Sequence, residues 1–590
     1  MSGGSPAETR VQPAARTTPA PPAPAPAPPA PSPAAAVPAA DVPAAARDLI
    51  TGLVAAPWGQ VSPSVYETGR LVALAPWLTG HAERVAYLVR TQRPDGGWGA
   101  PDDGYALVPT LSATEALLSV LARRAAAPAN GAGPAPGDVV RAAERGLRRA
   151  RGLLYWGPRQ DALPDMPAIE LIVPALVQAL NEHLAALRAA GETAWPEPGL
   201  PLPDGMDDGK LRFVRRLLGT GAEPPQKLMH ALEIAGDAAR GLPQARPEPT
   251  GTIGASPAAT AAWLGDRPPA DPSAPARWYL ETVTAAHGGP VPVGFPLTVF
   301  ERGWVLAWLE RAGVPFVAPP ELVLSLTAPL GADGTPAAAG LPADADTTAG
   351  ALYALALLGA PHRPDPLWEY ETATHFCTWR GEEGASLTTN AHVMEAFGEY
   401  LASVGRDRIG AEAAGRYAAT VAKVAGWLAE RQRPDGSWTD RWHASPFYAT
   451  ACCALALDRF GGERHAAAVD RARRWVLDTQ RTDGTWGRWD GTVEETAYAV
   501  QVLLLTAPRA GAPGGPGGLD GTTSYEECRR AAERARPLLE ADLGRPAADR
   551  AGDPPLWHDK DLYHPTAIVR AAVLAAVHLL MPGAPPSPEK

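Results

Sequence analysis

Two carboxylates one residue apart are the part of this sequence most able to do chemistry. Asp344 and Asp346 stand in the run Asp344-Ala-Asp346-Thr347-Thr348, directly before an apolar stretch with helical character. Either aspartate could cap that helix, which would be an ordinary structural role. Close carboxylates repel each other, however, so one of them can stay protonated near neutral pH. A protonated carboxyl in an apolar pocket is the kind of Brønsted acid that protonation of an unactivated alkene requires.

The composition limits which other functions are open. At 590 residues the chain is too long for one ordinary core. Its net charge of −11 argues against a nucleic-acid partner. The four cysteines form neither a disulfide framework nor a metal motif, which fits a reducing cytoplasm. No apolar run is long enough to span a bilayer, and no signal peptide is recognisable, so we expect a cytoplasmic protein without a transmembrane segment.

The elements that must position the two aspartates are predicted to be helices. Residues 1–43 are almost all Ala, Pro, Ser and Gly, which predicts a disordered tail. The rest is rich in Ala, Leu, Arg and Glu. A unit of Gln, three residues, Gly, one residue and Trp occurs at 92–98, 432–438 and 480–486, each time between helical stretches. Its Asp-Gly pair suits a tight turn, its Gln can bind backbone at the start of the next helix, and its Trp can pack over the joint. Such repeats predict an α/α barrel.

These features together resemble the class II terpene cyclases, which start their reaction by protonation. The repeats resemble the QW motifs of terpene cyclases, and 344–348 resembles the DxDTT variant of the DxDD motif. Further segments resemble that family in the expected order, from about Tyr66 to the end of the chain. They are 165–174, 227–233, 256–261, 291–304, 390–393, 441–448, 494–498 and 556–563.

The resemblance implies an all-α fold of two α/α barrel (toroid) domains, called γ and β, with the active site between them. We place the first helix of the β domain at 44–58, the inserted γ domain at 59–300 and the rest of the β domain at 301–590. Two loops, Ala125 to Gly137 and Gly511 to Gly521, are predicted to be insertions.

The resemblance also implies roles for the motif residues. Asp346 corresponds to the general acid, and Asp344 supplies the neighbouring carboxyl. Thr347 and Thr348 can donate hydrogen bonds. The fourth motif position is often Asp in the family but Thr here, which removes a negative charge, so hydrogen bonds must contribute more of the acidity.

Other polar residues are assigned by resemblance, each against a plain structural alternative. Ser386 and Asn390, four residues apart, resemble the pair that orients the acid; an exposed polar pair is the alternative. His230 occupies the position of a histidine that helps the terminal deprotonation in plant relatives. Its partner Asn is replaced here by Val293, so a buried core histidine is an equally good interpretation.

The substrate contacts are predicted in three groups. A carbocation needs apolar walls and π faces, and the candidates, for which core packing is as good an explanation, are Trp304, Tyr448, Tyr498, Trp442 and Tyr563. The candidate diphosphate partners, for which surface charge is the alternative, are Lys227, Arg441, Arg488 and Lys560. Mg²⁺ is expected with the diphosphate, held through Glu170 with Asp161 or Asp165 nearby. The DDxxD motif of cyclases that ionise the diphosphate is missing, so the diphosphate should be retained.

We therefore expect a cyclase that closes two rings in a linear prenyl diphosphate, either geranylgeranyl or farnesyl diphosphate. The product would be of copalyl, halimadienyl or drimenyl type. A cyclase acting on squalene is the first alternative, and an inactive toroid that binds a partner is the second. A protein prenyltransferase subunit would need a zinc site that these cysteines do not supply convincingly. The oligomeric state is open, with a homodimer as one candidate.

Overall fold

The structure is a computed structural model that describes residues 1–2, 41–126, 133–192, 195–382, 384–507, 523–546, 550 and 552–582. The predicted tail lies almost wholly outside the described residues, as does the loop Gly511 to Gly521. The loop Ala125 to Gly137 is described only at its two ends.

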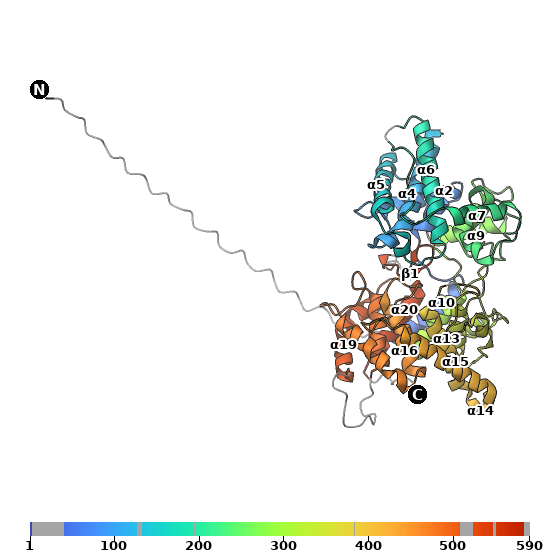
Figure 1. Ribbon diagram of the computed structural model, residues 1–590, viewed down its shortest axis with the longest axis vertical. Helices are drawn as coiled ribbons and strands as arrows, with labels where there is room; N and C mark the ends of the chain where they lie inside the picture. Colours follow the sequence, from blue (N-terminus) through green and yellow to red (C-terminus); the bar gives the residue numbers. More distant parts are fainter. Residues whose placement is uncertain are drawn as a thin grey trace. The chain divides into compact units, whose positions relative to one another are not determined.

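A first group of helices lies between residues 65 and 286 (Figure 1). They are α2 (Val65–Leu74), α3 (His81–Arg90), α4 (Asp103–Ala126), α5 (Pro136–Trp156), η1 (Gln160–Ala162), α6 (Ile169–Ala189), α7 (Gly209–Gly219), η2 (Gln226–Ala239), α8 (Pro257–Leu264) and α9 (Pro275–Ala286). Contacts run from α2 to α4, α6, η2 and α8, and α8 returns to α2, which closes a ring. Helices α3, α5, α7 and α9 pack against its outside.

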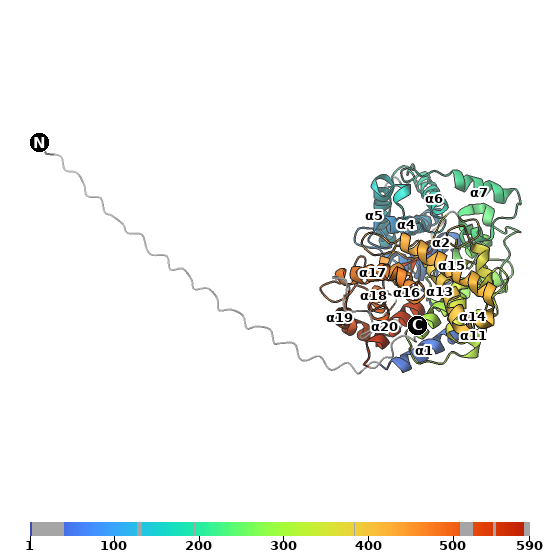
Figure 2. The same cartoon turned by 60° about the horizontal axis from the view of Figure 1, so that its bottom comes forward.

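A second group contains the carboxylate motif (Figure 2). It comprises α1 (Val42–Ala55), α10 (Val299–Arg311), α11 (Pro320–Thr327), α12 (Ala345–Leu357), η3 (Asp365–Tyr370), α13 (Leu387–Val404), α14 (Arg406–Ile409), α15 (Ala411–Glu430), α16 (Pro446–Phe460), η4 (Glu463–His465), α17 (Ala466–Asp478), α18 (Val493–Leu505), α19 (Tyr525–Leu543) and α20 (Thr566–Leu580). Contacts join α10, α12, α13, α16, α18 and α20 in that order, and α20 returns to α10. Helices α1, α11, α15, α17 and α19 lie outside this ring.

The two closed rings confirm the predicted all-α fold of α/α barrel type. The inner helices α12 and α20 are buried around almost their whole circumference, which explains why their sequences are almost continuously apolar. The outer helices α5 and α17 bury one face and expose the other. Residues 40–590 form one compact unit, and the boundary drawn between the γ and β domains stays a prediction.

The three repeats build the same joint in both rings. Trp98, Trp438 and Trp486 are fully buried, and each indole nitrogen donates to a carbonyl at the end of the preceding outer helix, at 2.8, 2.9 and 2.7 Å. The sequence predicts that the Gln side chains bind the start of the following helix, but they do not. Each donates to the carbonyl of its own turn glycine and to a carbonyl of the next outer helix, in α5, α17 and α19. The repeat therefore joins neighbouring outer helices.

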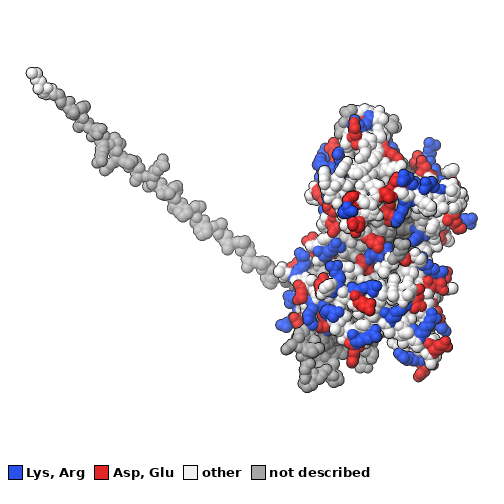
Figure 3. Space-filling model, viewed as in Figure 1, with Lys and Arg blue, Asp and Glu red and all other residues white. Residues whose placement is uncertain are grey.

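A short hairpin links the two groups of helices. Strands β1 (Trp557–His558) and β2 (Leu562–Tyr563) pair antiparallel, and Figure 1 shows β1 between the two groups. Side chains alternate along a strand, so Trp557 and His558 face different surroundings. Among the described residues, the segment Asp103–Ala125 is long and apolar enough to cross a membrane, but 89% of its most apolar window is buried inside the fold. On the face shown in Figure 3, Lys and Arg are interspersed with Asp and Glu.

Candidate active site

Asp344 caps the helix that carries the acid motif. Its backbone is extended, and its Oδ1 accepts from the backbone N–H of Thr347 at 2.6 Å, so α12 begins at the next residue. The Thr348 hydroxyl donates to the backbone oxygen of Asp344 at 2.6 Å and accepts from the N–H of Thr335 at 2.9 Å. Burial, more than the charge of Asp346, raises the pKa of Asp344 to about 8. This carboxyl is therefore mostly neutral at pH 7.

Asp346 lies in the first turn of α12 and faces α13. Its Oδ1 is 2.8 Å from Nδ1 of His392, and the two side chains are 13% and 9% exposed. Burial by itself lowers the pKa of His392, but the charge of Asp346 outweighs it and holds that pKa well above its usual range. His392 is thus cationic at neutral pH.

The Asp346–His392 pair has the features that a strong acid requires. An imidazolium that donates to one carboxyl oxygen stabilises the carboxylate that remains after the proton leaves. Because Asp344 is neutral, it adds no second negative charge next to this pair. The two aspartates therefore have different surroundings: Asp344 caps the helix, and Asp346 is paired with His392.

An aromatic cage lies beside the Asp346–His392 pair. We define it as Trp304, Tyr448, Tyr498, Trp557 and Tyr563. Trp304 packs edge-on against His392 at 4.9 Å and donates to the Tyr448 hydroxyl at 2.7 Å. Tyr448 lies 5.3 Å from Tyr498 and 4.6 Å from Trp557, between ring centroids. Burial raises the pKa of Tyr448 and Tyr563, and the charge of Asp346 adds to both rises, so both rings lie within its electrostatic reach.

The cage offers π faces to a cation. Rings of this kind stabilise a nearby positive charge by roughly 0.5–2 kcal/mol each. A cavity of about 20 Å³, room for about one water molecule, lies against Trp304 and His392.

A larger groove borders the hairpin. It measures about 510 Å³ and is lined by residues of both helix groups, among them Tyr105, Asp165, Arg431, Arg441 and His558. Its two arginines can bind an anionic group. His558 neighbours Trp557 of the cage in β1, so the groove and the cage meet at the same strand.

Comparisons with known proteins agree with this geometry. Residues 399–507 match the squalene-hopene cyclase C-terminal domain family. The chain is 43% identical to the ent-copalyl diphosphate synthase of Streptomyces sp. (strain KO-3988), with 90% of this chain and 95% of the relative covered. It is 40% identical to the labda-7,13-dienyl diphosphate synthase of Streptomyces clavuligerus, with 91% and 92% covered. The solved structure of ent-copalyl diphosphate synthase from Streptomyces platensis matches with a TM-score of 0.79 at 45% identity, covering 92% of this chain and all of that one.

The chain belongs to the bacterial class II terpene cyclases. This confirms the resemblance drawn from the motifs, and the protein is an enzyme of the prenyl diphosphate cyclase type. Within the cyclase, several of the individual residue assignments need correction.

The pair Ser386 and Asn390 does not orient the acid. Ser386 caps α13, where it accepts from the N–H of Thr389 and donates to Asp440, both at 3.0 Å. The Asn390 amide binds both backbone groups of Phe376, each at 2.9 Å, and so holds the loop before α13. His392, two residues further along, lies on the side of α13 that faces Asp346. Thr348 likewise ties the helix to the loop at Thr335 and does not donate to either carboxylate.

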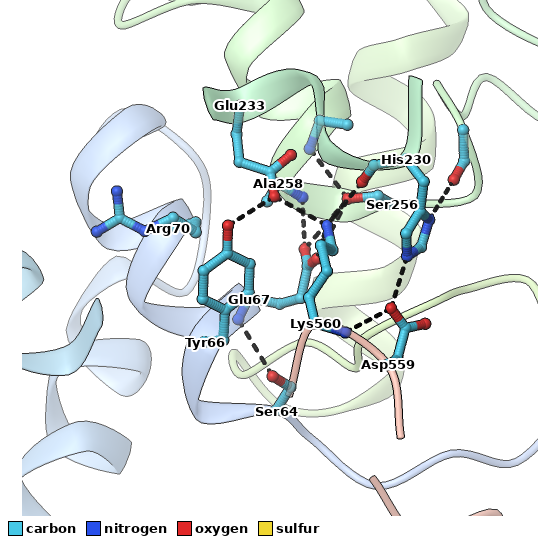
Figure 4. Close-up of polar contacts among 12 residues, drawn as sticks. Ser64, Tyr66, Glu67, Arg70, His230, Glu233, Ser256, Ala258, Asp559 and Lys560 are labelled. Carbon is cyan, nitrogen blue, oxygen red and sulfur yellow. Dashed lines mark hydrogen bonds and ion pairs between the residues drawn. The ribbon is translucent and has the colours of Figure 1, made fainter. Parts of the chain in front are cut away.

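Lys560 is not available to bind a diphosphate. Figure 4 shows its ammonium group between Glu67, Glu233 and Ser256, where its side chain is completely buried. It donates to Glu233 at 2.9 Å and to the Ser256 hydroxyl at 2.8 Å, and it also pairs with Glu67. A buried ammonium with two carboxylate partners is already compensated. Lys560 instead fixes the turn of the β1–β2 hairpin against α2, η2 and α8.

His230 belongs to the same network. Its Nε2 is 2.8 Å from Oδ1 of Asp559 and its Nδ1 is 2.6 Å from the backbone oxygen of Gly254 (Figure 4). Burial by itself lowers the pKa of His230, but the charge of Asp559 reverses this, and the net shift is upward. With both ring nitrogens engaged, His230 fits the structural interpretation rather than that of a terminal base.

The remaining binding candidates lie outside the cage, at the groove, beside it or on the surface. Trp442 lies outside the cage, because its ring packs against Trp379 at 5.2 Å and under Arg441 at 5.1 Å. Arg441 lines the groove and pairs there with Asp165 and Glu382. Arg488 stacks on Tyr105 and Trp489 beside the groove, and Lys227 is exposed. The arginines and Lys227 stay predictions as diphosphate partners.

The three carboxylates assigned to Mg²⁺ do not come together. Asp161 pairs with Arg159, Asp165 with Arg441, and Glu170 with Lys210 at 3.6 Å. Across the described residues, no group of three His, Cys, Asp or Glu side chains is placed to hold a metal ion. These residues therefore form no three-carboxylate metal site, and Glu170 as a Mg²⁺ ligand with Asp161 or Asp165 nearby stays a prediction.

Sequence reasoning missed two residues of the site. His392 lies inside a segment that resembles the family, but the role of orienting the acid was assigned to Asn390 in the same segment. Trp557 packs against Tyr448, His443, Phe300 and Tyr563, which makes it central to the cage. It stands only six residues before Tyr563 in the sequence, and the two are cross-strand partners in the hairpin.

Proposed function

We propose that this cyclase converts geranylgeranyl diphosphate into a bicyclic diphosphate of copalyl or labdadienyl type. The observation that carries the proposal is the Asp346–His392 pair at the wall of an aromatic cage. The names of the two relatives and of the solved structure, each of which the chain matches over about nine tenths of its length, support a diterpene substrate. Farnesyl diphosphate, with a drimenyl-type product, is the nearest alternative.

The reaction begins at Asp346. Its carboxyl protonates the terminal alkene of the substrate, and the π electrons of the next double bonds close the two rings in turn. His392 stabilises the carboxylate that remains. The cage rings stabilise the positive charge as it moves, and their packing keeps water away from the cation. The diphosphate is retained, since nothing in this sequence of steps ionises it.

We also propose that the diphosphate binds in the groove lined by Arg431 and Arg441, where it competes with Asp165 for the exposed edge of Arg441. Arginine binds phosphate oxygens through paired N–H groups, and the groove meets the cage at β1. Mg²⁺ accompanies the diphosphate, bound mainly by the phosphate oxygens and by at most one or two protein carboxylates, as is usual for this ion. The cytoplasm is the proposed location, in keeping with four buried cysteines that are all free thiols.

Incubation with geranylgeranyl diphosphate, farnesyl diphosphate and squalene, each with Mg²⁺, tests the proposal. Products are analysed by mass spectrometry after phosphatase treatment. We expect a bicyclic C20 alcohol from geranylgeranyl diphosphate and much slower conversion of the other two substrates. Preferred conversion of farnesyl diphosphate would change the substrate, and conversion of squalene alone would overturn the diphosphate cyclase proposal.

A further inference from the structure

Glu494 is a buried carboxylate in the wall of the cage that the steps above do not use. It lies in the first turn of α18, and its side chain is 3% exposed. Its Oε1 accepts three hydrogen bonds, from Nε2 of His443 at 3.0 Å, Nε1 of Trp557 at 2.6 Å and the Tyr498 hydroxyl at 3.1 Å. Two of these donors, Trp557 and Tyr498, are cage residues.

The surroundings keep Glu494 ionised. Burial by itself raises the pKa of Glu494, but the hydrogen bonds from His443 and Trp557 outweigh it and hold that pKa below its usual range. Both ring nitrogens of His443 are engaged, because its Nδ1 accepts from the backbone N–H of Ser445 at 3.0 Å and its Nε2 donates to Glu494. The negative charge beside the cage is therefore on Glu494.

The second oxygen of Glu494 faces away from these donors. Oε2 is buried without a hydrogen-bond partner and lies 3.8 Å from Nδ1 of His564. Both ring nitrogens of His564 are also buried without hydrogen-bond partners, and Nε2 lies 4.0 Å from a carboxylate oxygen of Asp553. The exposed fraction of the side chains rises from 3% at Glu494 to 4% at His564 and 17% at Asp553. A row of titratable groups thus leads from the cage toward solvent.

We propose that Glu494 receives, through the hydroxyl of Tyr498, the proton that ends the cyclisation. The inference rests on the proposed function. A C–H bond next to the cationic carbon breaks, and its electron pair forms the new alkene. The proton goes to the Tyr498 oxygen while Tyr498 passes its own proton to Oε1 of Glu494. The protonated Glu494 then turns about its Cγ–Cδ bond and gives the proton to Nδ1 of His564, and His564 passes its Nε2 proton to Asp553 and solvent. One proton enters the substrate from Asp346 and one leaves it, so the reaction is balanced.

Burial lowers the pKa of His564, which favours its neutral ring and makes the imidazolium, once formed, quick to pass the proton on. The charged groups that act on it are Glu494, Asp553, Arg550 and Asp542. The carboxylate also attracts the cation, since a negative charge held in a dry cage acts over several ångströms. Glu494 accordingly determines both where the positive charge comes to rest and which proton is lost.

Two variants test the proposal through the products they form from geranylgeranyl diphosphate. Tyr498→Phe removes one hydroxyl, and Glu494→Gln keeps the shape but removes the charge. In both we expect the wild-type alkene to fall from the main product to less than half of the total. Bicyclic diphosphates that carry a hydroxyl group, or an alkene at another position, should replace it. The ratio of products does not depend on how much of the protein is folded.

Glu115→Gln is the matched control. Glu115 is also a buried carboxylate, paired with Arg70 and His183 in the first helix group, and its variant should give the wild-type product ratio. An unchanged ratio in Tyr498→Phe or in Glu494→Gln overturns the proposal. If Glu494→Gln fails to fold, Tyr498→Phe decides alone, because it leaves the carboxylate in place. Wild-type protein that forms no bicyclic diphosphate would instead refute the proposed function.

The route to solvent has its own test. In His564→Phe we expect kcat to fall about tenfold with KM and the product ratio unchanged, because only the return of the carboxylate to its ionised form is slowed. A wild-type kcat in this variant overturns the role of His564.

Discussion

At the scale of single residues, the site depends on two neighbouring aspartates in unlike surroundings. Asp344 is buried as a helix cap, and Asp346 is paired with His392. The sequence was sufficient to find the aspartates, because their spacing and the apolar run after them are local features. It was not sufficient to choose His392 over Asn390. Both lie on α13, and only its packing against α12 decides which side chain meets the acid.

The pairing predicts the effect of removing the imidazole. In His392→Gln, kcat should fall by roughly 10²–10³, the range expected when an acid loses the group that supports it, while KM changes little. Steady-state kinetics with geranylgeranyl diphosphate measure both. His375→Gln is the control, since His375 stacks on Trp427 and contacts the Thr372 hydroxyl instead. A kcat within twofold of wild type in His392→Gln would argue that the imidazole does not support the acid.

The raised pKa of Asp344 predicts a dependence of stability on pH. An unfolded Asp loses its proton near pH 3.9, but the folded Asp344 loses it only near pH 8. Between these values the folded state binds the extra proton, so this carboxyl destabilises the fold increasingly as pH rises. Asp344→Asn removes that dependence. The melting temperature of the variant relative to wild type should rise between pH 5 and pH 8, and a constant or falling difference would contradict the assignment.

At the scale of elements, the repeated joints were predictable from the sequence because their residues lie within seven positions of one another. The glycine is required by geometry. Gly436 has φ +95°, and an added Cβ would lie 2.4 Å from the carbonyl oxygen of Arg471. The target of the Gln side chain was not predictable, since it lies on an outer helix 36 to 51 residues away.

Gly436→Ala should therefore destabilise the second ring. The left-handed backbone and the close carbonyl together should cost about 1–3 kcal/mol or more, seen as a lower melting temperature. Gly152→Ala is the matched control, because Gly152 lies inside α5 with nothing within 4 Å of an added Cβ. That variant should be neutral or slightly more stable. Equal melting temperatures for the two variants would show that the turn does not need glycine.

At the scale of the whole molecule, the two helix groups are joined through contacts that no local pattern contains. Lys560 meets Glu233 and Glu67 across separations of several hundred residues, and the hairpin that it fixes carries Trp557 and Tyr563 into the cage. Sequence reasoning placed Lys560 at the diphosphate because a lone lysine in a motif looks like an anion ligand. Its burial between two carboxylates is decided by the tertiary fold.

The requirement for Mg²⁺ is also a property of the assembled site. Removing divalent ions with EDTA should lower kcat/KM for geranylgeranyl diphosphate at least tenfold, because the ion screens phosphate charge that the groove arginines meet only in part. Added Mg²⁺ should restore the rate, and the melting temperature without substrate should not change. An unchanged turnover in EDTA would show that the reaction does not need Mg²⁺.

The most direct test of the account is the turnover of Asp346→Asn on geranylgeranyl diphosphate. The amide has nearly the same shape as the carboxyl and can still accept from His392, but it has no acidic proton to give to the alkene. We predict a loss of at least about a thousandfold in kcat, with a melting temperature close to wild type. A folded Asp346→Asn protein that forms the bicyclic diphosphate at a rate within tenfold of wild type would contradict the central claim.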